Sequence, residues 1–166
     1  MLRLVLAAAG MAALAAGALA QGAHVHGHAT LNIAIEQNTV QMELEAPAAD
    51  IVGFEHAPQS AEERAALAEA EAALKSPLEL FRLPEAAGCR VDGVDMEHRG
   101  EGDHSEFHVT YTLACTDIAA IDAIAFGYFE RFPRAEELEV NVVSDAGQQH
   151  YEAVRNSPSI SIGSGR

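Results

Sequence analysis

Residues 23–35 read AHVHGHATLNIAI and carry three histidines two residues apart, His24, His26 and His28. Side chains of an extended strand alternate between its two faces, so we expect these histidines to share one face. The opposite face would then be apolar, with Ala29, Leu31, Ile33 and Ile35. Neighbours on one face of a strand lie about 6.6 Å apart, which lets two imidazoles converge on one ion. The stretch therefore predicts a strand that begins at a metal site.

The chain that follows predicts a hairpin and a return towards these histidines. Residues 40–46 alternate again, and the polar link 36–39 between the two runs is typical of a β-hairpin with one solvated face. Because the second strand runs back past the first, segment 50–58 should lie near His24 and His26. His56 in that segment is therefore the leading remote ligand. An exposed histidine beside a helix is the alternative interpretation.

Helix and strand signals alternate in the rest of the chain. Ser60 and Glu63 have the capping-box spacing at the start of a helix that ends near residue 75. A second helix is expected over residues 117–123. We expect the remaining strands over 89–96, 104–113, 138–143, 149–154 and 159–162, with a charged turn over 97–103.

This order of elements indicates the fold class. It predicts an α+β fold of antiparallel β-hairpins with two main helices. The two halves of the chain are similar in outline, which leaves open two similar lobes packed together, although no residue-level repeat supports a duplication. The strand over 104–113 places His104, Glu106 and His108 on one face and forms a second histidine cluster.

Residues 1–20 have the pattern of an export signal. Arg3 precedes an apolar run that ends in Ala18-Leu19-Ala20, the small-x-small pattern that signal peptidase recognises. We expect cleavage before Gln21 and a periplasmic protein with a single zinc-binding α+β domain over residues 21–166. An uncleaved membrane anchor is the alternative. No later segment is apolar enough to cross a bilayer, so no contact with the membrane is expected after cleavage.

Charge and cysteine content limit the partners further. The chain has 25 acidic and 10 basic residues, a formal net charge of −15, and loss of Arg3 with the leader makes it −16. Such a surface repels nucleic acid and anionic membranes and attracts cations, so we expect no nucleic-acid partner. Cys89 and Cys115 are an even number in an oxidising compartment, which favours a disulfide over thiolate metal ligands.

The available donors indicate zinc. Imidazole and carboxylate without thiolate or thioether suit Zn(II), and the same donors accept Cu(II) or Ni(II). Glu55, Glu106 and Asp103 are oxygen donors near the histidines. The sequence has no His-Glu-x-x-His, no Gly-x-Ser-x-Gly and no phosphate-binding or dinucleotide-binding glycine motif. The alternatives to a zinc binder are a zinc hydrolase with Glu55 or Glu106 as general base, and a structural domain with incidental histidines.

Several motifs together resemble the periplasmic zinc-regulated ZrgA-like proteins. These motifs are residues 24–34, the Gly-Phe-Glu-His-Ala-Pro run at 53–58, the Cys89/Cys115 pair, Phe107-His108, and the Phe-Glu-Arg-Phe-Pro run at 129–133. The resemblance spans essentially the whole mature chain. It implies a zinc-binding protein, induced under zinc limitation, that assists zinc acquisition beside a zinc ABC importer or the importer's binding protein.

The resemblance also implies a set of ligands. It carries over His24, His26, His56 and His108, with His104 next, and the strand pattern adds His28. Some members of the family have long insertions rich in histidine and aspartate where this chain has only residues 96–104. One zinc site is therefore expected.

Overall fold

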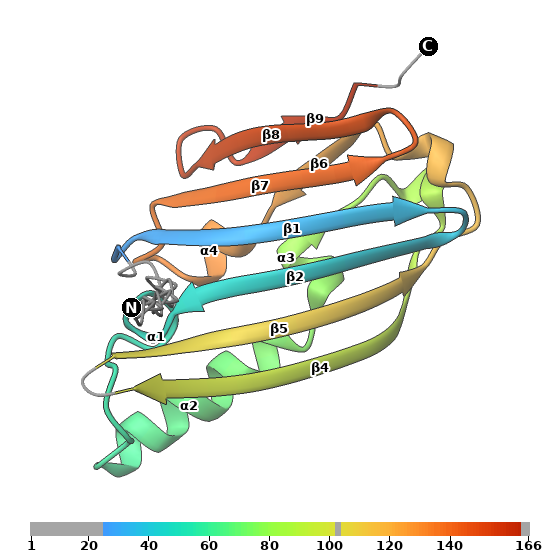
Figure 1. Cartoon of the computed structure of the whole chain (residues 1–166). Helices are drawn as coiled ribbons and strands as arrows, with labels where there is room; N and C mark the ends of the chain where they lie inside the picture. The colour runs from blue at the N-terminus through green and yellow to red at the C-terminus, as the bar shows by residue number, and fades with distance from the viewer. Residues whose placement is uncertain (1–24, 102–103, 164–166) are drawn as a thin grey trace, which may run out of the picture.

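The computed structural model describes residues 25–101 and 104–163, which form a large sheet with helices and a small sheet on one side of it (Figure 1). The strand order of the large sheet is β4-β5-β2-β1-β7-β8. Its strands are β1 (His28–Glu36), β2 (Thr39–Pro47), β4 (Arg90–Glu101), β5 (His104–Ala114), β7 (Glu137–Ser144) and β8 (Gly147–Val154). The expected leader, His24 and the candidate oxygen donor Asp103 lie outside the described residues.

The elements that cover one side of the large sheet, here called its inner side, are short except for the helix α2. The small sheet has the order β3-β6-β9, with β3 (Phe81–Arg82), β6 (Ala123–Phe126) and β9 (Ser159–Ser161). The α-helices are α1 (Ala48–Ile51), α2 (Ala61–Leu74), α3 (Pro77–Leu80) and α4 (Tyr128–Arg131), and the 3-10 helices are η1 (Glu85–Ala87) and η2 (Ile118–Ala120).

The predicted first hairpin forms the centre of the large sheet. Strand β1 pairs antiparallel with β2, with Leu31 opposite Leu44 and Ile33 opposite Met42. These four side chains are at most 2% exposed, because alternate residues of both strands are apolar and face the inner side. They belong to one core with buried residues of the helices and the small sheet. The predicted apolar face of residues 29–35 is confirmed.

Strands from distant parts of the chain complete the sheet. Strand β5 pairs antiparallel with β2, β7 pairs with β1 in parallel, and β4 and β8 form the two edges. The α+β class and the three antiparallel hairpins are confirmed, whereas the parallel β1–β7 pairing differs from the expected arrangement. Hairpins from both halves of the chain belong to one continuous sheet, so the sheet does not divide into two similar lobes.

Of the two predicted helices, the first is confirmed and the second is shorter than expected. In α2, Ser60 Oγ accepts the Glu63 N–H at 3.0 Å and Glu63 Oε2 accepts the Ser60 N–H at 3.2 Å, which is the predicted capping box. The second helix, expected over 117–123, is only the 3-10 helix η2, capped by the side chain of Asp117. It cannot extend to residue 123 because β6 begins there and pairs with β9.

The hairpin of β4 and β5 is longer than predicted. Residues 97–101 belong to β4 and pair with the first residues of β5, where a charged turn was expected. Charged residues occur in this strand because it lies at the edge of the sheet and is largely exposed. The expected disulfide joins Cys89 and Cys115 and links the start of β4 to the residue after β5.

Candidate metal centre

Three potential metal ligands, His26, Glu55 and His104, come together near the first residues of β1 and β5. These two strands begin at the same end of the large sheet (Figure 1). Glu55 Oε1 lies 3.2 Å from His26 Nε2, and Glu55 Oε2 lies 3.0 Å from His104 Nδ1. One ligand atom from each residue lies within 4.8 Å of the others. Zinc binds imidazole nitrogen and carboxylate oxygen at about 2.0–2.2 Å, so small side-chain rotations bring all three onto one ion.

The three side chains differ in exposure. Glu55 is 14% exposed, whereas His26 is 61% and His104 is 69% exposed. The carboxylate of Glu55 is therefore the most buried part of the group, and the two imidazoles lie at the surface. An ion bound here would be accessible from solvent.

The loop that carries Glu55 is fixed from two sides. Ser105, which follows His104 in β5, donates its hydroxyl to the Glu55 carbonyl oxygen at 2.7 Å. Gly53 has a left-handed φ of 90°, and a Cβ at this position would lie 2.7 Å from Arg134 Cζ. Only a glycine lets the guanidinium approach the loop this closely. These contacts hold Glu55 next to His104.

The turn that carries His26 is held by Asp50, a buried residue of α1. Both carboxylate oxygens of Asp50 accept the Gly27 N–H at 2.9 Å. Burial raises the pKa of Asp50, while the Gly27 N–H and the nearby His26 and His28 lower it and offset part of the cost of the buried charge. The turn therefore lies close to α1 and to the loop that follows it.

Two of the other predicted ligands have different surroundings. His28 is the first residue of β1, and its Nδ1 lies 3.4 Å from Glu137 Oε1. The ring of His56 stacks on Phe54 at 5.3 Å, and its Nε2 lies 3.8 Å from Glu63 Oε1 in α2. Among the described residues, neither His28 nor His56 belongs to the group formed by His26, Glu55 and His104. As ligands, both stay predictions.

His108 lies further along β5, among charged residues. It contacts Glu106, and its Nδ1 lies 3.7 Å from Glu45 Oε1 and 3.4 Å from Arg99 Nη1. A guanidinium this close to the ring opposes the binding of a second cation at the same nitrogen. The structure thus brings His26 and His104 together through Glu55 and keeps His108 apart from them.

The predicted histidine face of the first strand needs one correction. His26 lies in a turn, and β1 begins only at His28, because Gly27 adopts a left-handed φ of 88° and interrupts the extended chain. His24 lies outside the described residues. The alternation of a strand therefore does not relate His26 to His28, and the two face different partners.

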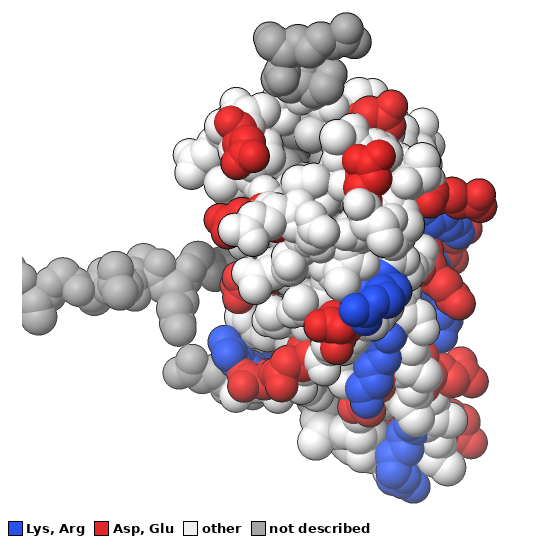
Figure 2. Space-filling model, turned by 90° about the vertical axis from the view of Figure 1, so that its right-hand side faces the viewer, with Lys and Arg blue, Asp and Glu red and all other residues white. Residues whose placement is uncertain are grey.

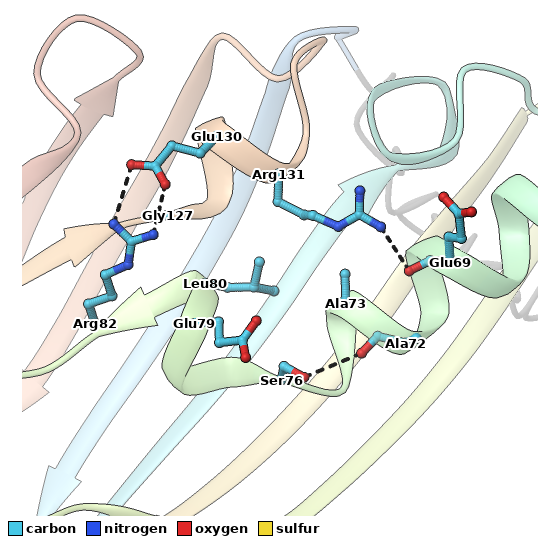
Figure 3. A pocket seen from close by; sticks show the side chains of 10 residues that line it. All are labelled: Glu69, Ala72, Ala73, Ser76, Glu79, Leu80, Arg82, Gly127, Glu130 and Arg131. Atoms are coloured by element: carbon cyan, nitrogen blue, oxygen red, sulfur yellow. Dashed lines mark hydrogen bonds and ion pairs between the residues drawn. The ribbon is translucent and has the colours of Figure 1, made fainter.

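Two hollows of the surface lie away from this group. The first, of about 580 Å³, lies among α2, α3 and α4 and is drawn in Figure 3. Its two arginines already have partners, since Arg82 pairs with Glu130 at 2.8 Å and Arg131 donates to the Glu69 carbonyl oxygen at 3.1 Å. The second, of about 490 Å³, lies over the central strands and is lined by polar and apolar residues without histidine. Neither hollow borders the metal group.

Acidic groups dominate the surface. Figure 2 shows acidic side chains from the top to the bottom of the face that it draws, whereas basic side chains keep to its middle and lower parts. Several arginines are neutralised in ion pairs with carboxylates: Arg82 with Glu130, Arg90 with Asp92, and Arg99 with Glu97. With a formal net charge of −15, the protein attracts cations from solution.

A family assignment follows from the sequence as a whole. Residues 23–162 match the model described as ZrgA family zinc uptake protein. The chain belongs to the ZrgA family. The match confirms the resemblance noted in the motifs, and it includes His26, Glu55 and His104. No curated protein sequence matches the chain.

ZrgA membership connects the chain with zinc uptake, which is a transport-associated role. The donor set of two imidazoles and one carboxylate agrees with this description, because it is one that zinc accepts. None of the helices within residues 25–101 and 104–163 is long and apolar enough to cross a membrane.

Proposed function

We propose that the protein is a periplasmic, non-catalytic zinc-binding protein that captures the ion and hands it over to an importer. The observation that carries this proposal is the convergence of His26, Glu55 and His104 from three separate segments of a zinc uptake protein. In this function zinc is the cargo, and the three side chains are its ligands.

Zinc usually has four ligands in proteins, so the group leaves one position for a further donor. His24 lies two residues before His26 in the sequence, and we propose it as the fourth ligand. A water molecule is the other candidate for this position. The same donors accept Cu(II) and Ni(II), and the family description favours zinc among the three.

The exposure of the two histidines supports transfer of the ion. His26 and His104 are more than half exposed, so an ion held between them is open to solvent on one side. A partner can therefore approach the ion from the solvent side and replace one histidine at a time. The partner in this proposal is a zinc ABC importer or its binding protein.

The leader pattern and the disulfide support the proposed periplasmic location. The first 20 residues have the pattern of a cleaved leader, and the Cys89–Cys115 disulfide is a bond of oxidising compartments. Cell fractionation with an antibody against the protein tests this part of the proposal. Periplasmic protein that begins at Gln21 is the expected result, and a full-length protein in the cytoplasm would contradict it.

Zinc titration by calorimetry tests the ligands. We expect tight binding of one zinc ion to the wild type and much weaker binding to His26→Ala and to His104→Ala. His150→Ala is the matched control, because His150 is an exposed histidine of β8 whose Nδ1 lies 3.0 Å from Asn141 Oδ1. His56→Ala and His108→Ala should bind zinc as the wild type does. Loss of binding in these two variants alone would refute the proposed ligand set.

A further inference from the structure

Backbone hydrogen bonds of Gly27 join the turn before β1 to two other segments of the chain. The N–H of Gly27 donates to both oxygens of Asp50, and its carbonyl oxygen accepts the backbone N–H groups of Glu136 and Glu137 at 2.8 Å each. Its left-handed φ of 88° suits glycine, and a Cβ would lie 3.3 Å from Glu136 Cγ. Both polar groups of the Gly27 backbone are therefore held, one by α1 and one by the residues at the start of β7.

Asp50 is an unusual residue for its place. It belongs to the four-residue helix α1 and is only 3% exposed, between neighbours of the apolar core. A buried carboxylate costs free energy unless hydrogen bonds and charges compensate it. Here the Gly27 N–H supplies part of that compensation, and the bond links two segments that are 23 residues apart in sequence.

The two segments joined by this bond carry two of the proposed zinc ligands. His26 directly precedes Gly27, and Glu55 follows α1 by four residues. His26 itself is largely exposed, so the packing of its own side chain does little to hold the turn in place. The bond from Gly27 to Asp50 thus links the segment that carries His26 to the segment that carries Glu55.

We propose that Asp50 is a positioning residue of the zinc site, which anchors the turn at Gly27 so that His26 faces Glu55 and His104. This inference rests on the proposed function, because it concerns the same three ligands. Asp50 acts through His26 and does not bind the ion. Its effect on zinc affinity must therefore depend on the presence of the His26 imidazole.

A double-mutant cycle with the purified protein tests this dependence, with ZnCl₂ as the ligand in calorimetry. We expect Asp50→Ala to weaken zinc binding about 10- to 100-fold, the range typical of residues that orient a metal ligand. In the His26→Ala background, Asp50→Ala should cause no further loss, because residues that act through each other are not additive. Asp50→Asn keeps an oxygen that accepts the Gly27 N–H, so it should recover most of the affinity.

The possible results separate this inference from the proposed function. Wild-type affinity in Asp50→Ala would overturn the inference and leave the ligand set intact. Equal losses in the Ala and Asn variants that persist without His26 would also overturn it, because Asp50 would then act through its charge. Unchanged zinc affinity in His26→Ala would overturn the proposed site itself, and the inference with it.

A second variant covers the case in which Asp50→Ala does not fold, as judged by circular dichroism. Gly27→Ala disturbs the same anchor from the other side, through its left-handed φ and the contact with Glu136. It should weaken zinc binding in the wild-type background and have no effect in the His26→Ala background. Equal losses in both backgrounds would overturn the inference.

Discussion

Replacement of Glu55 by glutamine tests the candidate site at its centre. The Glu55 carboxylate lies 3.2 Å from His26 Nε2 and 3.0 Å from His104 Nδ1, so it contacts both imidazoles at once. Glutamine keeps the shape of the side chain and removes its negative charge. Because Ser105 holds the Glu55 backbone through its carbonyl oxygen, the loop should stay in place in the Glu55→Gln variant.

The expected loss follows from the role of Glu55 as a ligand. Residues that only orient a ligand change metal affinity 10- to 100-fold, so loss of the carboxylate should cost at least about 100-fold, or about 2.8 kcal/mol. At free zinc of 100 times its Kd, the wild type is stabilised by about 2.7 kcal/mol. At the same zinc concentration, the variant would gain only about 0.4 kcal/mol.

Thermal unfolding with and without zinc measures this difference. The wild type should unfold several degrees higher with zinc, whereas Glu55→Gln should shift by about one degree. Glu63→Gln is the matched control, because it removes the same charge from a glutamate that also faces a histidine, His56, at 3.8 Å. If both variants lose the zinc effect equally, or if Glu55→Gln keeps it, Glu55 is not a ligand and the reasoning fails.

Further predictions concern the frame of the site. Removal of the disulfide in Cys89→Ser/Cys115→Ser should lower the free energy of unfolding by about 3–4 kcal/mol, from the 26-residue separation, and an unchanged urea midpoint would refute this. Gly53→Ala should cost roughly 1–3 kcal/mol because of the left-handed φ of 90°, and an equal or higher thermal midpoint would contradict it. The pKa of Glu63 is lowered by the N–H of Gln59, so the stabilising effect of its carboxylate is present at neutral pH and is lost in acid, as pH falls through this lowered pKa. The difference in the free energy of unfolding between wild type and Glu63→Gln should therefore vanish in acid. A difference that does not change with pH would show that the pKa of Glu63 is not lowered by folding.

Local patterns in the sequence were sufficient to predict several elements. The first hairpin was predicted from the alternation of apolar and polar residues alone. Leu31 and Leu44 belong to the apolar faces of the two strands, and both are fully buried. The helix α2 follows from the capping box of Ser60 and Glu63. Each of these elements is determined by residues close in sequence.

Other features depend on contacts between distant residues. The parallel pairing of β1 with β7 joins segments more than 100 residues apart, and no residue pattern in either strand distinguishes it from an antiparallel pair. The long hairpin of β4 and β5 was predicted too short, because Glu97 and Arg99 are charged as turn residues are. Charged residues are common both in turns and in edge strands, because both are exposed to solvent.

The site was predicted in part. The predicted hairpin correctly implied that segment 50–58 lies near the turn at His26. The side chain that contacts His26 is, however, that of Glu55, and its neighbour His56 stacks on Phe54 instead. Adjacent residues of an irregular loop point in different directions, and the direction here depends on the left-handed backbone at Gly53 and the hydroxyl of Ser105. Neither contact can be read from local sequence.

A crystal structure of the protein grown with zinc, with anomalous data collected at the zinc absorption edge, would locate the bound ion. We predict an anomalous peak about 2.0–2.2 Å from His26 Nε2, His104 Nδ1 and a Glu55 oxygen. A peak at His108, or at His28, with none between His26 and His104, would show that the protein binds zinc elsewhere.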